Sequence, residues 1–137
     1  MRALAILALS LAAAPAQAAD WPDLLGTWTG TSRAVVLGEG GHYGADSGKA
    51  RFVEAELTIE WTEEQDGRYI GTISSPARTE PKLGVLSNDG ISLFTVDSDG
   101  SSVGRLIDDD HFELCYQQTS AGDTLMTASC VIFERQG

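Results

Sequence analysis

The sequence predicts an all-β protein, an eight-stranded antiparallel up-and-down barrel in which each strand neighbours the one before it. Polar and apolar residues alternate with a period of two almost throughout, most clearly from Val53 to Trp61, as in strands with one buried face. Three x-Asp-Gly triplets mark tight turns, at 65–67, 88–90 and 98–100. Closure into a barrel removes exposed strand edges, and a two-sheet sandwich is the alternative.

The elements follow from these patterns in chain order. The first strand begins next to Gly26, and its connection to the second, through a Gly-rich stretch at 38–49, is the only long one. The remaining links are short, which indicates hairpins between successive strands. We expect strands at 27–37, 50–62, 68–75, 82–87, 91–97, 102–107, 111–118 and 125–135.

The turn at 65–67 sets the register of the second hairpin. A three-residue loop with Gly67 in the left-handed conformation pairs Ile59 with Ile73, Trp61 with Gly71 and Glu63 with Tyr69. These pairs keep the apolar side chains on one face, whereas a two-residue loop at Asp66-Gly67 would mix the faces. We therefore predict the three-residue loop.

Size and charge exclude several classes of protein. The chain has 137 residues, too few for two ordinary domains, and 9 Lys+Arg against 20 Asp+Glu give a formal net charge of −11. This composition is not that of a collagen, a disulfide-dense scaffold or a disordered chain. The negative charge also opposes general nucleic-acid binding.

The first 18 residues have the pattern of a secretory signal peptide. Arg2 precedes a short apolar run from Ala3 to Ala14, and Ala16-Gln17-Ala18 forms a small-x-small cleavage site. The run is shorter than the ~20 residues that cross a bilayer, which disfavours a membrane anchor. We expect cleavage after Ala18, a single barrel domain at 19–137, and a secreted or periplasmic location without a membrane span.

Export makes a disulfide between Cys115 and Cys130 plausible, since oxidising compartments preserve such bonds. The two cysteines are symmetric about residues 121–124, so a hairpin turning there would place them opposite each other. The chain contains no C-x-x-C motif and no His at metal-ligand spacing from these cysteines, so we expect neither a metal site nor a cofactor.

The segment Leu24-Leu25-Gly26-Thr27-Trp28-Thr29-Gly30, at the start of an eight-stranded meander, resembles the calycin superfamily of lipocalins, avidins, fatty-acid-binding proteins and bacterial metalloprotease inhibitors. The resemblance implies that Trp28 lies at the closed end of the barrel, packed against an Arg of the last strand. Arg135 has that place here. The biotin-binding residues of avidins cannot be placed, and the inhibitor family positions its disulfide differently.

A barrel of this topology sorts the loops between two ends. One end carries seven acidic residues, interpreted as a solvated surface or, alternatively, a cation site or docking face: Glu63, Glu64, Asp66, Asp89, Asp108, Asp109 and Asp110. The other end carries the 38–49 loop with His42 and Tyr43. It also carries four cations that predict a mixed or locally basic mouth for an anionic or polar ligand or an acidic loop of a partner: Lys49, Arg51, Arg78 and Lys82.

Small inward residues leave room inside such a barrel, with aromatic residues as walls. The preferred function is binding of a small hydrophobic or amphipathic molecule, with the 38–49 loop as a gate. The candidate ligand-binding residues are Trp61, Tyr69, Tyr116, Phe133, His42 and Tyr43. The alternatives are a periplasmic inhibitor of a secreted enzyme, acting through Ala19–Leu25 or the open-end loops, and a structural domain with a filled core.

Catalysis has little support in the sequence. His42 and His111 are the only histidines, and neither belongs to a nucleophile elbow, a metal-spaced cluster or a phosphate-binding Gly-rich turn. No carboxylate pair is singled out among the many acids. We therefore predict a binding protein and not an enzyme.

Overall fold

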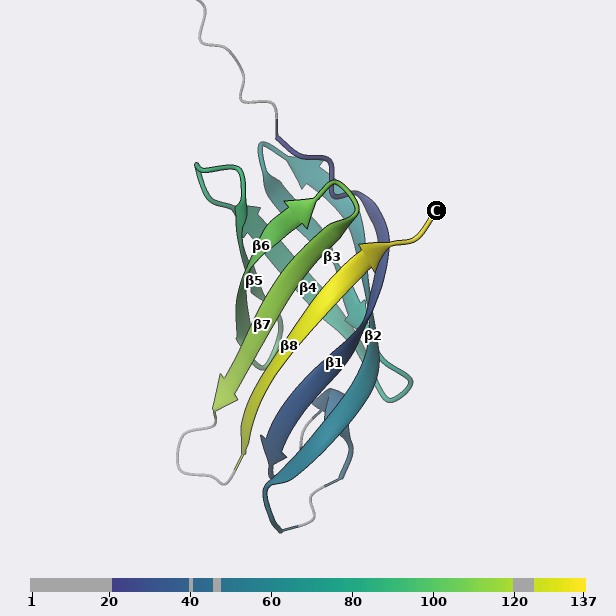
Figure 1. Cartoon of the computed structure of the whole chain (residues 1–137), viewed down its shortest axis with the longest axis vertical. Helices are drawn as coiled ribbons and strands as arrows, with labels where there is room; N and C mark the ends of the chain where they lie inside the picture. The colour runs from purple at the N-terminus through teal and green to yellow at the C-terminus, as the bar shows by residue number, and fades with distance from the viewer. Residues whose placement is uncertain (1–20, 40, 46–47, 120–124) are drawn as a thin grey trace, which may run out of the picture.

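The computed structural model describes residues 21–39, 41–45, 48–119 and 125–137, which form a closed eight-stranded antiparallel barrel (Figure 1). Each strand pairs with its predecessor, and β1 pairs with both β2 and β8. The predicted barrel is confirmed and the sandwich alternative is wrong. The strands are β1 (Gly26–Leu37), β2 (Arg51–Gln65), β3 (Arg68–Ser74), β4 (Thr79–Leu86), β5 (Ser92–Val96), β6 (Ser101–Asp108), β7 (His111–Thr119) and β8 (Met126–Arg135).

The two ends of the barrel differ in what covers them. At the closed end, uppermost in Figure 1, β1 begins, β8 ends and the acidic turns gather. At the open end, β1 leads into a 3-10 turn, η1 (Gly41–Tyr43), before the chain enters β2. Within the described ranges, no helix is long and apolar enough to cross a membrane.

Aromatic side chains fill the closed-end half of the barrel. Trp28 is fully buried, and the centroid of its ring lies 4.7 Å from that of Phe112. Phe112 in turn lies 5.2 Å from Phe133, and Trp61 lies 5.8 Å from Tyr69. These tilted contacts are the geometry that aromatic pairs prefer. The small residues Gly71 and Gly84 lie against the Trp61 ring, where a Cβ atom would crowd it.

Residues Trp21–Leu25 cover the closed end. Leu24 is 2% exposed in the core, and the Tyr69 hydroxyl donates a hydrogen bond of 2.6 Å to the carbonyl of Pro22. Trp21 packs over Gly67 so closely that a Cβ there would lie 2.7 Å from its ring. The described part of the proposed inhibitory segment is therefore built into the barrel, while Ala19 and Asp20 lie outside the described residues.

The Arg135 guanidinium lies 4.2 Å from the centroid of the Trp28 ring, as the resemblance implied. Its Nη atoms also donate to the carbonyls of Leu25 at 3.0 Å and Asp23 at 2.6 Å. The Trp28 indole donates to the carbonyl of Leu24 at 2.9 Å. Trp28 and Arg135 thus connect the first strand, the last strand and the covering segment Trp21–Leu25.

The predicted three-residue loop at 65–67 is wrong. Asp66 and Gly67 form a two-residue turn with φ of 53° and 72°, and Gln65 pairs with Arg68. The predicted pairs Ile59–Ile73 and Trp61–Gly71 are present, but Glu63 pairs with Ile70 instead of Tyr69. A β-bulge between Trp61 and Glu63 inserts the extra residue, which restores the buried face on both strands.

Two predicted strand boundaries also differ. The second strand extends to Gln65 because of this tight turn, and the fourth begins at Thr79 instead of 82. Thr79 and Glu80 pair with Ser74 and Ile73 of β3 despite their polarity. The remaining boundaries agree with the prediction to within two residues.

Cys115 and Cys130 form the predicted disulfide, as directly paired residues of β7 and β8. The residues at the centre of the expected turn, 121–124, lie outside the described ranges. We expect the Cys115→Ala/Cys130→Ala variant to lose about 3 kcal/mol of unfolding free energy in the chain-entropy model. Urea unfolding of the oxidised protein and the variant measures the difference, and an unchanged midpoint would contradict it.

Candidate functional site

A network of charged and polar side chains occupies the open-end half of the barrel. Glu80 points inward from β4 and is 6% exposed. It accepts hydrogen bonds from His42 Nε2 at 3.0 Å, from Arg78 Nη2 at 2.6 Å and from the Ser98 hydroxyl. Arg78 also binds Asp99, and this hydrogen bond lowers the pKa of the Asp99 carboxyl. The network joins the turn after β3 to the turn after β5.

Below this network lies a buried ion pair. Lys82 Nζ is 3.1 Å from Asp97 Oδ2, and the two side chains are 1% and 3% exposed. Burial lowers the pKa of the Lys82 ammonium, and Asp97 offsets part of that shift. The Tyr116 hydroxyl lies 3.4 Å from Asp97 Oδ1, and burial raises the pKa of this phenol, with the Asp97 charge adding to the effect. Such a pair needs every partner in place, because an unpaired buried charge is costly.

The η1 turn inserts two side chains into the barrel mouth. His42 Nδ1 is 2.8 Å from the Ser75 hydroxyl, while its Nε2 contacts Glu80. The Tyr43 hydroxyl donates to Ser129 at 2.9 Å and shares a hydrogen bond of 2.8 Å with Ser32.

Arg51 holds the backbone around this turn. Its guanidinium donates to the carbonyls of Gly38 at 2.8 Å and Gly44 at 3.0 Å. Both glycines have a φ of 82°, a conformation that favours Gly.

A cavity of about 30 Å³ remains beneath His42 and Tyr43. This is room for one or two water molecules. Its wall changes character along the barrel. The side towards the open end is polar, with Lys82, Asp97, Ser102, Tyr116 and Ser129, and the side towards the core is apolar, with Leu57, Ile73, Leu114, Val131 and Phe133.

The structure brings four of the six candidate ligand-binding residues to this cavity, namely His42, Tyr43, Tyr116 and Phe133. Trp61 and Tyr69 lie instead in the closed-end core, since both are 1% exposed there and do not line the cavity.

The charges at the open-end mouth are mixed, which is the first of the two predicted alternatives, and not locally basic. Arg78 and Lys82 are neutralised by carboxylates that the sequence analysis did not single out, namely the buried Glu80 and Asp97 and the more exposed Asp99 in the turn after β5. The alternation in Glu80-Pro81-Lys82-Leu83 would have revealed Glu80 and Lys82 as inward-facing charges, had the polar face of that strand been assigned to the interior.

Three buried polar atoms have no hydrogen-bond partner among the described residues: Trp61 Nε1, Thr95 Oγ1 and Thr127 Oγ1. A buried polar group without a partner costs about 1–3 kcal/mol. Bound water or ligand commonly satisfies such groups.

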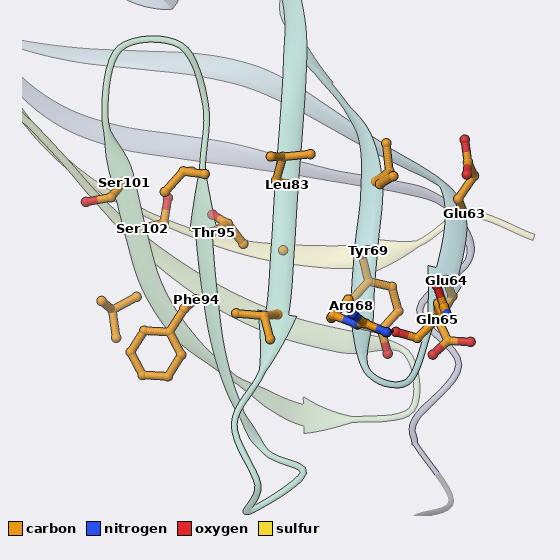
Figure 2. Close-up of a pocket in the computed structure, with 15 residues that line it drawn as sticks. Glu63, Glu64, Gln65, Arg68, Tyr69, Leu83, Phe94, Thr95, Ser101 and Ser102 are labelled. Carbon is orange, nitrogen blue, oxygen red and sulfur yellow. The ribbon is translucent and has the colours of Figure 1, made fainter.

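A second hollow lies outside the barrel, as a shallow groove of about 870 Å³ across β3–β6 (Figure 2). Its floor is the backbone of the inward-facing row Tyr69, Gly84, Thr95 and Ser102. Glu63, Glu64, Gln65 and Arg68 close one end. Its walls are the outer groove residues, six side chains that are 43–50% exposed: Ile70, Leu83, Val85, Phe94, Val96 and Val103.

Within the described ranges, no group of three or more His, Cys, Asp or Glu side chains is arranged to hold a metal ion. The fold and site therefore define a closed up-and-down β-barrel with an aromatic closed end and a charged, plugged open end.

Neither a protein-family model nor a curated protein sequence matches the chain. Among solved structures, the chain is similar to a redesigned β-barrel, with 11% identity and a TM-score of 0.42. The match covers 83% of this chain and 92% of that one. This likeness carries no argument about function.

Proposed function

We propose that this protein binds a small amphipathic molecule in the open-end half of its barrel, with the Gly41–Tyr43 turn as a gate. The observation that carries the proposal is the cavity beneath the turn, polar on one side and apolar on the other. An apolar portion of the ligand would lie against Leu114 and Phe133. Its polar group would lie beside Lys82 and Asp97.

The ligand must take the place of the His42 and Tyr43 side chains, because the cavity that remains beneath them holds only water-sized molecules. Four side-chain hydrogen bonds keep these residues in the mouth. Each contributes about 0.5–1.5 kcal/mol net, so withdrawal of the turn costs a few kcal/mol. Burial of ~200 Å² of apolar ligand surface offsets a cost of that size, at about 25 cal/mol per Å² before association costs.

The test measures the affinity of the amphipathic anion 8-anilinonaphthalene-1-sulfonate for gate variants. Tyr43→Ala removes two hydrogen bonds and a ring from the mouth, so the open state becomes more populated. We expect the apparent Kd of the probe to fall by roughly tenfold or more relative to the unmodified protein. Fluorescence titration measures this change.

Phe52→Ala is the matched control, because Phe52 is also an aromatic residue near the open end but is 90% exposed outside the barrel. Its affinity for the probe should equal that of the unmodified protein. Val96→Glu controls for the outer groove. Probe binding that Val96→Glu abolishes and Tyr43→Ala leaves unchanged would place the probe outside the barrel and contradict the proposal. Near-ultraviolet circular dichroism checks that each variant keeps its packing.

We further propose that the chain is exported, that residues 1–18 are removed as a signal peptide, and that the barrel is calycin-like. The Cys115–Cys130 disulfide supports an oxidising compartment. The Trp28–Arg135 contact supports the calycin-like assignment. Mass spectrometry of the protein recovered from the periplasm tests export, and a mature chain that begins elsewhere than Ala19 would contradict the cleavage site.

A further inference from the structure

The outer face of β3–β6 differs from the rest of this acidic protein. The chain carries 20 Asp+Glu, yet strands β3–β6 contain only Glu80, which points into the barrel, and Asp108, the last residue of β6. By contrast, three exposed carboxylates follow the outer side of the neighbouring strand β2, at Glu54, Glu56 and Glu60. The acid-free face is thus a local exception in a chain of net charge −11.

The outer groove residues lie side by side on this face. The register places Leu83 between Ile70 and Val96, and Phe94 between Val85 and Val103, so one apolar row runs across β3–β5 and a second across β4–β6. Figure 2 shows Leu83 and Phe94 projecting from neighbouring strands over this surface. Sheet faces with such rows pack against another sheet by interdigitating their side chains.

The size of this face suits a protein partner. Six apolar side chains of this size and exposure present on the order of 400 Å², comparable with the largest apolar patch on an ordinary monomer. The polar residues around them bring the face towards the ~800 Å² that each partner contributes to a standard interface.

Charge limits where two copies can meet. Two chains of net charge −11 repel each other, and the repulsion is least on the outer face of β3–β6, whose strands direct no carboxylate outward before Asp108 at the end of β6. The end of the groove holds charges of both signs, Glu63, Glu64 and Arg68, so a two-fold axis near this end sets Arg68 of each copy beside the carboxylates of the other. We propose that the outer face of β3–β6 is the interface of a homodimer, in which the outer groove residues of two copies pack face to face. This inference is independent of the ligand site inside the barrel.

The experiment is sedimentation velocity on the exported, oxidised protein from about 1 μM to about 1 mM. The unmodified protein should convert from monomer to dimer within this range. Val96→Glu places a carboxylate in each apolar surface, and the two-fold axis doubles its effect, so we expect the dimer Kd to rise about 100-fold or more. Val35→Glu is the matched control, since Val35 is 45% exposed on β1 and Val96 is 47% exposed. It should dimerise as the unmodified protein does.

Salt provides a second measurement. Added NaCl screens repulsion between two acidic copies, so the dimer should tighten as ionic strength rises. A basic partner on this face would instead bind more weakly in salt. A protein that stays monomeric at the highest concentration, or a Val96→Glu variant that dimerises as well as Val35→Glu, would overturn the proposal. Urea unfolding midpoints for both variants confirm that neither substitution acts by unfolding the barrel.

Discussion

Replacing Lys82 with methionine is expected to lower the free energy of unfolding by about 3–5 kcal/mol, because it leaves the Asp97 carboxylate buried without its ion-pair partner. The Coulombic attraction at 3.1 Å is strong in the barrel interior, but desolvation of the two charges opposes it. The pair as a whole therefore adds little net stability. Removal of one member exposes the full desolvation cost of the other.

The double variant Lys82→Met/Asp97→Asn separates the desolvation cost of the unpaired Asp97 carboxylate from the other effects of losing Lys82. Asparagine keeps a side-chain oxygen for the Gly100 amide, which donates to Asp97 Oδ1 at 2.9 Å, but removes the buried charge. We expect the double variant to regain at least ~1–2 kcal/mol relative to Lys82→Met. Urea unfolding monitored by tryptophan fluorescence measures each step.

Arg105→Met supplies the control for an exposed pair. Arg105 lies 4.0 Å from Glu113, with side chains 69% and 36% exposed, so its loss should change stability by no more than about 0.5 kcal/mol. If Lys82→Met were equally mild, Asp97 would have to find another partner or take up a proton. The buried pair would then not be a fixed part of the interior wall that we assign to the ligand.

The fold was predictable because its information is local. Period-two alternation, short turns and the symmetric cysteines each depend on neighbouring residues, and they placed all eight strands and the disulfide. The hairpin at Asp66-Gly67 shows the limit of such reasoning. A β-bulge between Trp61 and Glu63 compensates for the two-residue loop. The alternation of buried and exposed residues alone does not distinguish a three-residue loop from a two-residue loop with a bulge.

The candidate site was harder to predict because alternation does not say which face of a strand is inside. In β4 the apolar residues Leu83 and Val85 face outward, and Glu80 and Lys82 face inward. The usual assignment of apolar side chains to the core is therefore inverted from Glu80 to Val85, and only Leu86, at the end of the strand, returns an apolar side chain to the core. His42 and Tyr43 were found because they stand out in a Gly-rich loop, whereas their partners Glu80 and Ser129 are ordinary strand residues.

At the closed end, Trp28→Ala is expected to cost about 3–5 kcal/mol of unfolding free energy and to lower Tm by roughly 10–20 °C. Trp28 is completely buried, with 0% of its surface exposed. Its ring packs on Phe112, and its indole N–H donates a hydrogen bond to the carbonyl of Leu24. Truncation leaves a cavity in the aromatic core and removes the surface beneath Arg135. Differential scanning calorimetry measures the loss.

Trp28→Phe separates the contribution of the buried ring from that of the indole hydrogen bond. Phenylalanine refills much of the cavity but cannot donate to the Leu24 carbonyl, so we expect a loss intermediate between those of the alanine variant and the unmodified protein. Ile132→Ala, at a side chain 54% exposed on β8, is the control and should change stability by no more than about 0.5 kcal/mol. A Trp28→Ala variant that unfolds like Ile132→Ala would show that the barrel closes without this residue. The contact between Trp28 and Arg135 would then contribute little to the stability of this chain.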